Sequence, residues 1–466
     1  MHPTRLTALL LLCMPAFAAN PPARPNVLFI AVDDLRDWIG YFGHNPQSKT
    51  PNYDRLSRMG TSFTRAYCAS PVCNPSRTAL MSGLRPSTSA VYENNIDFRP
   101  IIPPAKMLTT AFREAGYYVH GAGKIYHEAY RRREEWDDYL EKERGDPRPP
   151  AGRSEGVGGI KFAPLDCRDD ELSDWGIADY GIASLQRKHD QPFFLAVGFH
   201  KPHMPWNVPR KWFDLFPLES IKLPPYLEND LDDLPPAAVR MAHPETDHVP
   251  MQKSDRWKEA IQAYLATIAY CDMNLGRLLD ALEQSAYRDN TIICLWGDHG
   301  WHLGEKHHWR KFALWEEATK APFMWVVPGV TKPNTLCERT VDFMSIFPTL
   351  TDLCGIPTPA HNEGVSIRRL LADPKASWDL PALTTYRFNN HTVRSEGWRY
   401  IRYANGDEEL YDETRDPNEW TNLAAKPEFA ARKAELAKSL PRTNTPDPSD
   451  RAPKDQRQEK KRKKAD

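Results

Sequence analysis

Short apolar runs that alternate with helix-like segments constrain the fold of this chain more than any other feature. Such uninterrupted runs are typical of strands buried on both faces, as in parallel sheets. They lie at Asn26–Val32, Tyr117–Gly121, Phe193–Phe199, Thr291–Trp296 and Phe323–Val327. Apolar residues at helical spacing fill stretches between them, at Pro51–Gly60, Met107–Ala115 and, most clearly, Trp257–Ser285. The alternation predicts an α/β fold, with a mostly parallel sheet sandwiched by helices.

The chain changes character after Asp373, where short strand-like segments follow one another without long helices between them. The predicted strands are Tyr386–Arg387, Thr392–Arg394, Trp398–Tyr403 and Glu409–Tyr411, and a polar helix follows at Pro427–Ser439. We expect a main domain over 24–373 and a small antiparallel α+β subdomain over 374–440. Residues 441–466 form a charged tail whose composition predicts disorder, the alternative being a tether to a polyanionic glycan or a cell surface.

The first 19 residues have the pattern of a secretory signal peptide. Arg5 precedes an apolar run from Leu6 to Met14, and small residues at Ala16 and Ala18 predict cleavage near Ala18 or Ala19. The run is too short to span a bilayer, and no later stretch is apolar enough to do so. We expect a secreted or periplasmic protein without a membrane span. The formal net charge of −1 argues against nucleic acid as a partner.

The cysteine count singles out one thiol. Eight cysteines are present, and Cys13 lies in the predicted signal peptide. The seven that remain are an odd number, which in an exported protein marks one thiol for separate treatment. Setting Cys73 aside leaves every pairing of the other six open. Cys271 and Cys294 lie in apolar helix-like and strand-like runs typical of a core, so we predict no particular disulfide.

Ionisable residues follow the predicted strands at the points where the strands end. Asp33 and Asp34 follow the first run, and Asp298 and His299 follow the fourth. Ligands bind beyond the carboxyl ends of strands in open parallel sheets, and carboxylates gathered there need a hard cation such as Ca²⁺ or Mg²⁺. A helix cap or a salt bridge is the alternative for Asp33 and Asp34 taken alone. Further ionisable residues near the other run ends are Lys124, His127, His200, Lys201, His203 and Lys311.

The segment Cys73-Asn74-Pro75-Ser76-Arg77 carries the most specific motif, although five residues alone are also compatible with a thiol in an ordinary turn. Further blocks follow one another along the chain. They are NVLFIAVDDL (26–35), TPN (50–52), GKIYH (123–127), GFHKPHMP (198–205), GDHGWHLGE (297–305), and Lys311 with Trp315-Glu316. Together these blocks resemble the type I sulfatases over nearly all of residues 25–420, and GKIYH and GFHKPHMP are most similar to the iduronate-2-sulfatase branch. Leu84 departs from the pattern, since many relatives carry Arg after the Gly.

The resemblance implies a role for each of these residues. In that family a dedicated maturation enzyme oxidises the motif cysteine, here Cys73, to 3-oxoalanine (formylglycine), whose hydrate is the nucleophile. Arg77 would steady this hydrate, His127 would act as base, and Lys124 would add positive charge. His200, assisted by Lys311, would protonate the leaving sugar oxygen. Ca²⁺ would be bound by the modified Cys73 together with Asp33, Asp34, Asp298 and His299. Four further histidines would line the pocket or only its wall: His203, His302, His307 and His308.

The resemblance therefore implies an alkaline-phosphatase-like fold and a sulfatase that hydrolyses sulfate esters of a glycan. We expect an exo-acting enzyme on sulfated oligosaccharides, with a terminal 2-O-sulfated uronic acid as one candidate substrate. The loops Tyr130–Gly159 and Pro205–Met251 would set the choice of sugar. Two alternatives stay open. One is a phosphodiesterase or phosphonate monoester hydrolase of the same superfamily, and the other is an inactive glycan-binding protein with an unmodified Cys73.

Overall fold

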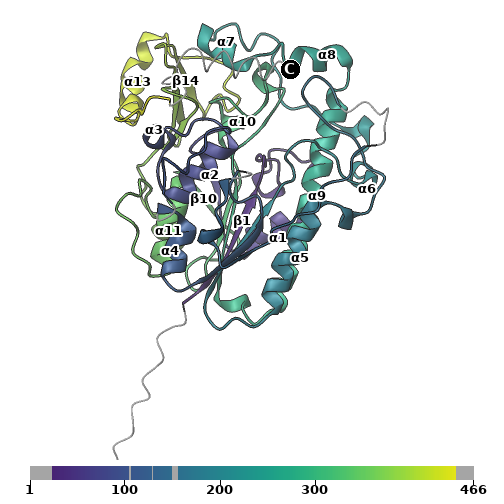
Figure 1. The fold of residues 1–466 in the computed structure, drawn as a ribbon. Helices are drawn as coiled ribbons and strands as arrows, with labels where there is room; N and C mark the ends of the chain where they lie inside the picture. Colours follow the sequence, from purple (N-terminus) through teal and green to yellow (C-terminus); the bar gives the residue numbers. More distant parts are fainter. Residues whose placement is uncertain (1–23, 104–105, 128–129, 150–155, 448–466) are drawn as a thin grey trace, which may run out of the picture.

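The computed structural model describes residues 24–103, 106–127, 130–149 and 156–447. The predicted signal peptide and the end of the charged tail lie outside these residues. An eight-stranded sheet occupies the centre, with strand order β10-β2-β9-β6-β1-β5-β3-β4 (Figure 1). Its strands are β1 (Asn26–Val32), β2 (Thr61–Tyr67), β3 (Tyr118–Gly123), β4 (Asp138–Tyr139), β5 (Phe193–Phe199), β6 (Thr291–Gly297), β9 (Phe323–Val326) and β10 (Thr335–Asp342).

The sheet is parallel except for one strand. β1 pairs in parallel with β5 and β6, β3 with β4 and β5, and β2 with β10. Only β9 among the described strands of this sheet runs against its neighbours, β2 and β6. The predicted α/β class with a mostly parallel sheet is confirmed.

Three strands of this sheet, β2, β4 and β10, were not predicted: β4 has only two residues and forms one edge, and β2 and β10 lie toward the other. The outermost strand, β10, alternates between buried and exposed residues, and β2 has two half-buried residues in its middle. Strands near an edge need not be apolar throughout, so neither segment forms the uninterrupted run that identified the central strands.

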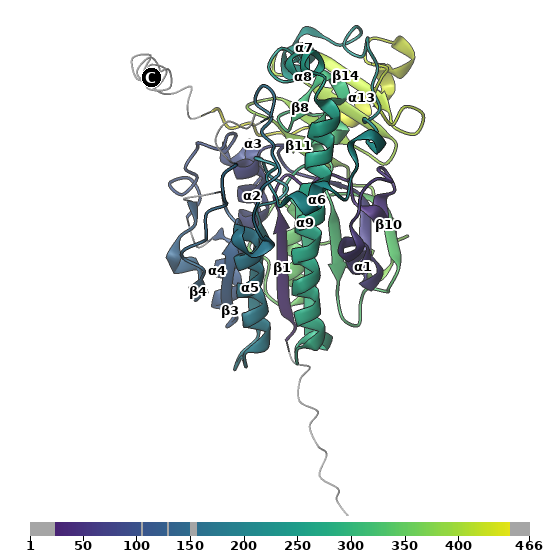
Figure 2. The same cartoon turned by 90° about the vertical axis from the view of Figure 1, so that its right-hand side faces the viewer.

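Helices cover both faces of the sheet, and β1 shows the division directly. Leu28, Ile30 and Val32 point into one core with α1 (Pro51–Met59), α5 (Ser173–Gln186) and α9 (Trp257–Gln284). Val27, Phe29 and Ala31 point into the other core with α2 (Cys73–Ser82), α4 (Leu108–Glu114) and α11 (Ile346–Leu353). Figure 2 shows α5 and α9 lying along the face that contains the first core. The sandwich follows from the period-two alternation of side chains along a strand.

The remaining helices are short, and most lie in the connections beyond the sheet. They are α3 (Pro86–Ser89), α6 (Arg210–Phe213), α7 (Pro236–Ala242), α8 (His248–Ser254), α10 (Glu316–Thr319) and α12 (Arg368–Ala372). A two-stranded hairpin of β7 (His302–Leu303) and β8 (Trp309–Arg310) also lies there. Within the ranges given above, no helix combines the length and the apolar character needed to cross a membrane.

A second, four-stranded sheet follows the main one, and its strands are antiparallel as predicted. It consists of β11 (Ala382–Thr385), β12 (His391–Arg394), β13 (Trp398–Arg402) and β14 (Glu408–Asp412), and α13 (Ala430–Ala437) packs on it. The first predicted strand was wrong. Tyr386 and Arg387 lie in the turn after β11, where Arg387 has a left-handed backbone with φ of 56°. The predicted boundary at residue 373 stays a prediction.

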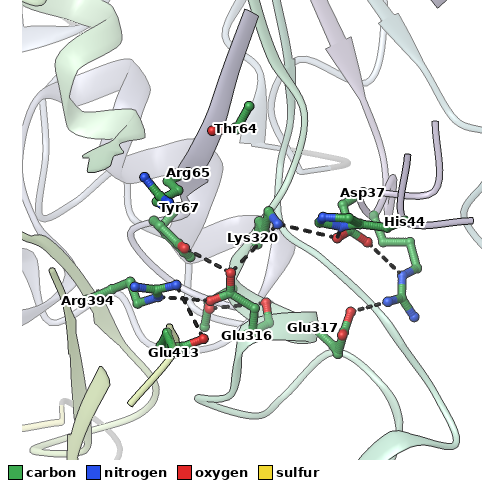
Figure 3. A network of polar contacts seen from close by, with 12 residues as sticks. Asp37, His44, Thr64, Arg65, Tyr67, Glu316, Glu317, Lys320, Arg394 and Glu413 are labelled. Atoms are coloured by element: carbon green, nitrogen blue, oxygen red, sulfur yellow. Dashed lines mark hydrogen bonds and ion pairs between the residues drawn. The ribbon is translucent and has the colours of Figure 1, made fainter. Parts of the chain in front are cut away.

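A buried ionic cluster joins the small sheet to the main one, with Glu316 at its centre (Figure 3). Arg394 of β12 lies 3.1 Å from the Glu316 carboxylate, and Arg399 of β13 contacts the same oxygen. On the other side Tyr67, at the end of β2, donates a hydrogen bond of 2.9 Å to Glu316, and Lys320 lies 3.7 Å away. Burial alone would raise the pKa of Glu316, but Arg394 and Arg399 outweigh it and hold the pKa well below its usual range.

We predict that Glu316→Gln destabilises the protein by about 3–5 kcal/mol, because it removes one of the two buried carboxylates, Glu316 and Glu413, that Arg394 and Arg399 share. The free energy of unfolding from urea titration measures the effect. Glu396→Gln is the matched control. Glu396 pairs with Arg339 at the surface, where its side chain is 45% exposed, and the loss should stay within about 1 kcal/mol. Equal effects of the two substitutions would contradict a central role for Glu316.

Candidate functional site

Four neighbouring strands end together at one edge of the main sheet. β6, β1, β5 and β3 are adjacent, and their last residues are in register: Val32 of β1 lies beside Gly297 and Phe199. Gly123 and Gly198 bring β3 and β5 close together here, since a Cβ on Gly123 would lie 2.0 Å from the Gly198 carbonyl oxygen. The residues that follow these strands therefore converge, as the sequence predicted. They are Asp33 and Asp34, Lys124, His200, and Asp298 and His299.

Three carboxylates meet at this edge without access to solvent. Asp33, Asp34 and Asp298 are fully buried. The backbone N–H of Asp34 donates a hydrogen bond of 3.0 Å to Asp298 Oδ1, and Asp34 has a left-handed backbone with φ of 58°. The Tyr264 hydroxyl on α9 donates to the Asp34 carbonyl at 2.8 Å and holds this turn. Such a group of buried negative charges is stable only if positive charge surrounds it.

Three cations from three different elements supply this charge. Lys124, after β3, lies 2.5 Å from Asp33, and Lys311 lies 2.7 Å from Asp34. Arg77, on α2, bridges Asp33 at 3.2 Å and Asp298 at 3.0 Å and also donates to the Lys124 carbonyl. The Arg77 guanidinium therefore organises the carboxylates, and its proposed contact with the modified Cys73 stays a prediction.

The two adjacent aspartates are not equally compensated. Burial would raise the pKa of Asp33, but the charges of Lys124, His203 and Arg77 outweigh it and keep the pKa well below its ordinary value. Burial also raises the pKa of Asp34, and there Lys311 does not compensate for it fully. Asp34 is thus the carboxylate in this group that most needs further positive charge.

Cys73 lies in the middle of this charged group, as the first residue of α2. Its Sγ is fully buried, 2.8 Å from Lys311 Nζ and 3.4 Å from His299 Nε2. Ser76, one turn later, donates from its hydroxyl to the Asp298 carbonyl at 2.5 Å and fixes the helix start. Burial raises the pKa of the Cys73 thiol to about 12, although Lys124 and Lys311 act against it. An unmodified thiol here is protonated at neutral pH and is a poor nucleophile.

Lys311 reaches Cys73 from a loop whose backbone is unusual. Arg310 and Phe312, on either side of it, have positive φ of 74° and 76°. A left-handed backbone at a residue other than glycine costs about 1–3 kcal/mol and persists only where neighbouring contacts enforce it. Asp247 makes two contacts with the Arg310 guanidinium, at 2.7 and 3.1 Å, and Phe312 N–H donates to the Pro71 carbonyl at 3.2 Å. These contacts point Lys311 inward.

The same residues are suited to hold a metal ion. One ligand atom from each of Asp34, Cys73, Asp298 and His299 lies within 4.8 Å of the others, and Asp33, Cys73 and His203 form a second such group. Asp34 Oδ2 is buried and accepts no hydrogen bond from any described residue. A buried carboxylate oxygen in this state is costly, and an oxygen-rich set with one imidazole suits a hard divalent cation. The residues present therefore fit the metal that the sequence implied.

Two histidines beside this group have opposite pKa shifts. Burial and then the charge of Lys124 lower the pKa of His127 to about 4, so this imidazole is neutral at neutral pH. Burial also acts to lower the pKa of His200, but Glu143 and Asp174 outweigh it and raise the pKa. The pair thus offers a proton acceptor and a proton donor, the states that the predicted roles require.

Two cavities flank the charged group. One, of about 380 Å³, is lined by Asp33, Lys124, His200, His203, Arg131 and Glu143 among others. The other, of about 610 Å³, lies between α7, the β8 loop and the turns of the small sheet. Arg310 and Phe312, which flank Lys311, line it together with Arg240, Tyr386, Arg387 and His308. The smaller cavity is therefore lined by Lys124 itself, whereas the larger one is lined by the two sequence neighbours of Lys311.

The sequence did not decide which of four further histidines line the pocket, and the structure places them in different surroundings. His203 Nε2 lies 3.8 Å from Asp34 Oδ2, and His308 lines the larger cavity. His302 is fully buried with its Nδ1 against the Glu305 carbonyl, and His307 stacks on His248. None of the seven cysteines in the described ranges forms a disulfide. Glu143 and Asp174, which hold His200, belong to no recognisable motif, and only their acidity could have indicated them.

Comparison with known proteins places these observations in a family. The sequence profile described as "Sulfatase" matches residues 25–356, and that described as "N-sulphoglucosamine sulphohydrolase, C-terminal" matches 304–445. The chain is 40% identical to a sulfatase of Formosa agariphila over 459 residues, which is 90% of this chain and 87% of that protein. It is 31% identical to the iduronate 2-sulfatase of Homo sapiens, over 72% of this chain and 70% of that protein.

Solved structures show the same fold at lower sequence identity. A 2-O GAG sulfatase has a TM-score of 0.69 at 22% identity, covering 89% of this chain and 90% of that one. A phosphonate monoester hydrolase of Agrobacterium radiobacter has a TM-score of 0.75 at 24% identity, covering 90% and 95%. The predicted alkaline-phosphatase-like fold is confirmed.

We predict that a divalent cation stabilises the protein through the buried carboxylates. At a hundredfold excess over its Kd, CaCl₂ should add about 2.7 kcal/mol to the free energy of unfolding of protein first treated with EDTA. Asp34→Asn should lose most of this gain, because it removes the charge of the uncompensated carboxylate. Asp137→Asn, at a carboxylate paired with Arg113 near the surface, is the control and should keep it. A gain of equal size in both variants would place the cation elsewhere.

Proposed function

The chain belongs to the sulfatase family and is a sulfuric ester hydrolase, and we propose that it cleaves sulfate esters of a glycan with a formylglycine derived from Cys73. The observation that carries this proposal is the position of Cys73 Sγ, 2.8 Å from Lys311 Nζ and among buried carboxylates and cations. Sulfate ester cleavage places negative charge on sulfuryl oxygens and on the leaving oxygen, so fixed positive charge is its main requirement.

The modification of Cys73 is supported by the state of the thiol. A buried thiol whose pKa is raised to about 12 does not supply a nucleophile at neutral pH. The hydrate of an aldehyde at this position would supply an oxygen nucleophile instead. Because Cys73 is fully buried, a maturation enzyme would have to reach it before folding is complete. We infer that such a formylglycine-generating enzyme acts on the unfolded chain, and that the pattern of residues 1–19 directs export to the periplasm or the medium.

Asp34, Asp298 and His299, with Asp33 and the modified Cys73, would hold the divalent cation, for which we propose Ca²⁺. When bound, the cation would withdraw negative charge from the nucleophile and from the sulfuryl oxygens. Lys124 and Lys311 hold positive charge on either side of residue 73. Arg77 keeps Asp33 and Asp298 in place.

The two histidines would divide the proton transfers between them. His200 would give a proton to the leaving oxygen, and His127, neutral at working pH, would then accept a proton from the remaining hydroxyl on residue 73, so that sulfate is released and the aldehyde returns. Each role matches the protonation state that the surroundings favour. The scheme is a general acid–base reaction with a covalent step on residue 73.

We propose an acidic, sulfated oligosaccharide as the substrate. The named relatives include an iduronate 2-sulfatase and an ulvan-active sulfatase, at 31% and 26% identity. The larger cavity combines arginines with aromatic rings, at Arg240, Arg387, Tyr386 and Phe312. Guanidinium groups bind carboxylates and sulfates, and rings pack on the faces of sugars. A terminal 2-O-sulfated uronic acid, which loses its sulfate while it stays attached to the end of the oligosaccharide, meets both requirements.

We predict that the matured protein hydrolyses p-nitrophenyl sulfate faster than p-nitrophenyl phosphate or bis-p-nitrophenyl phosphate. Cys73→Ala should lower kcat for the sulfate by about 10⁴-fold or more, because the nucleophile is removed. Mass spectrometry of the peptide that spans Cys68–Arg85 should show the modified residue in the active protein only. Cys167→Ser, at a partly exposed cysteine outside the charged group, is the control and should keep full activity.

Two outcomes would contradict the proposal and favour one of the alternative functions. A higher rate on the phosphate diester would favour a phosphodiesterase or phosphonate monoester hydrolase, the activity of a fold neighbour. An unmodified Cys73 with retained affinity for sulfated oligosaccharides and no turnover would favour a glycan-binding protein.

The pH dependence of kcat on a sulfate ester with a basic leaving group, such as unsubstituted phenyl sulfate, gives a separate prediction. The pKa of His127 is lowered to about 4, so its neutral, proton-accepting form persists as the pH falls and is lost only near pH 4. The pKa of His200 is raised from 6.5, so its protonated form persists above pH 6.5. The rate should therefore stay high from about pH 4 to above pH 6.5. His127→Ala should remove the acidic limb, and His200→Ala the basic one. An acidic limb near pH 6.5 would contradict these assignments.

A further inference from the structure

His200, the proposed proton donor, contacts the carboxylate of Glu143. This carboxylate has no role in the reaction proposed above. Glu143 Oε2 lies 2.7 Å from His200 Nε2, and both side chains line the cavity of about 380 Å³ that also contains Lys124 and Asp33. Glu143 belongs to the segment after β4 and His200 to the end of β5, 57 residues later. The contact is therefore made by the fold and not by local sequence.

The backbone of His200 is fixed independently of its ring. Asp174, fully buried at the start of α5, accepts hydrogen bonds from the N–H groups of His200 at 2.7 Å and Lys201 at 2.8 Å. With the backbone held, the remaining freedom of His200 is the rotation of its side chain. The hydrogen bond from Nε2 to Glu143 removes that freedom. No described residue forms a hydrogen bond with His200 Nδ1, and 35% of the side chain is exposed.

Resting on the proposed function, we propose that Glu143 is a positioning residue that holds His200 as proton donor to an alkyl leaving group. In the step it serves, the deprotonated nucleophile oxygen forms a bond to sulfur while the bond between sulfur and the leaving oxygen breaks, and the electron pair of the broken bond goes to the leaving oxygen. The proton on His200 Nδ1 moves to the same oxygen, which leaves as an alcohol. The imidazole is then neutral and keeps its Nε2–H bond to Glu143. The arrangement is that of a histidine oriented by a carboxylate on its opposite nitrogen.

Leaving groups differ in their need for a proton, so a residue that positions a proton donor indicates which class of ester is the substrate. A sugar alkoxide is a strong base and leaves well only when protonated, whereas p-nitrophenolate is stable as an anion. A histidine held in place as a donor therefore serves esters of alcohols and is of little use for esters of acidic phenols. Glu143 thus points to a sugar sulfate, and not an aryl sulfate, as the physiological substrate.

A purely structural role for Glu143 makes a different prediction. The Glu143 side chain is 29% exposed, and an ion pair of that kind contributes about 0–1 kcal/mol to stability. Its loss would then change the rates on all substrates by the same small factor. Dependence on the leaving group is a readout that separates the two roles.

The test measures kcat and KM of the full, matured chain on p-nitrophenyl sulfate and on unsubstituted phenyl sulfate, whose leaving group is the more basic. We expect Glu143→Gln to leave kcat for p-nitrophenyl sulfate within about twofold and to lower kcat for phenyl sulfate by about 10²-fold, the lower end of general-acid effects, with little change in KM. Glu143→Asp should restore part of the loss. The control is Glu283→Gln on α9, where a partly exposed carboxylate pairs with Arg55 and lines neither of the two cavities. It should leave the ratio of the two rates unchanged.

A double variant completes the test. His200→Ala should change the same ratio, and adding Glu143→Gln should lower it no further, because the two residues act as one unit. Equal losses on both esters in Glu143→Gln, or additive losses in the double variant, would overturn the role of Glu143. A wild-type protein inactive on both esters and on sulfated oligosaccharides would contradict the proposed function itself, which is a different result.

Discussion

Two adjacent buried strands end in three carboxylates at one edge of the sheet, and the need to neutralise them determines what else lies there. Arg77, Lys124 and Lys311 come from a helix, a strand end and a loop, and they balance the three negative charges one for one. A divalent cation added to a balanced group would make the pocket positive, which favours an anionic ester and the charge that develops on its oxygens. The same charges therefore explain two properties. The site is stable without the ion, and it attracts the anionic substrate when the ion is bound.

Much of this edge could be predicted because buried parallel strands have a simple sequence pattern. Continuous apolar runs identified β1, β5 and β6, and parallel pairing requires their carboxyl ends to meet. Asp33, Asp298 and His200 could therefore be assigned to one site from the sequence alone. Cys73 and Lys311 follow no such rule, because they come from a helix start and a loop. The odd cysteine count and the position of Lys311 near the fifth apolar run were weak signals, and the family motif assigned the two residues their roles; their contact across the sheet edge supports that use of the motif.

What could not be predicted depends on contacts between distant segments. β10 lies at the outer edge and β2 beside it, where half-exposed residues replace the apolar run, and Tyr386 and Arg387 form a turn that their composition did not indicate. Glu143 reaches His200 across 57 residues without any local signal. The left-handed backbone around Lys311 is likewise enforced by Asp247 and Pro71, which no inspection of the loop itself would reveal.

The ionic cluster around Glu316 has a consequence for how this protein can be recombined with its relatives. Glu316 begins α10 only five residues after Lys311, and Arg394 and Arg399 of the small sheet hold it from the other side. The small sheet is thus part of the support of a lysine that contacts residue 73. In a chimera that exchanged only the C-terminal strands, Glu316 would be held by side chains from another protein. The support of Lys311 would then differ from that in the native chain. The functional unit for grafting runs from the hairpin before Lys311 to the end of the chain's second sheet.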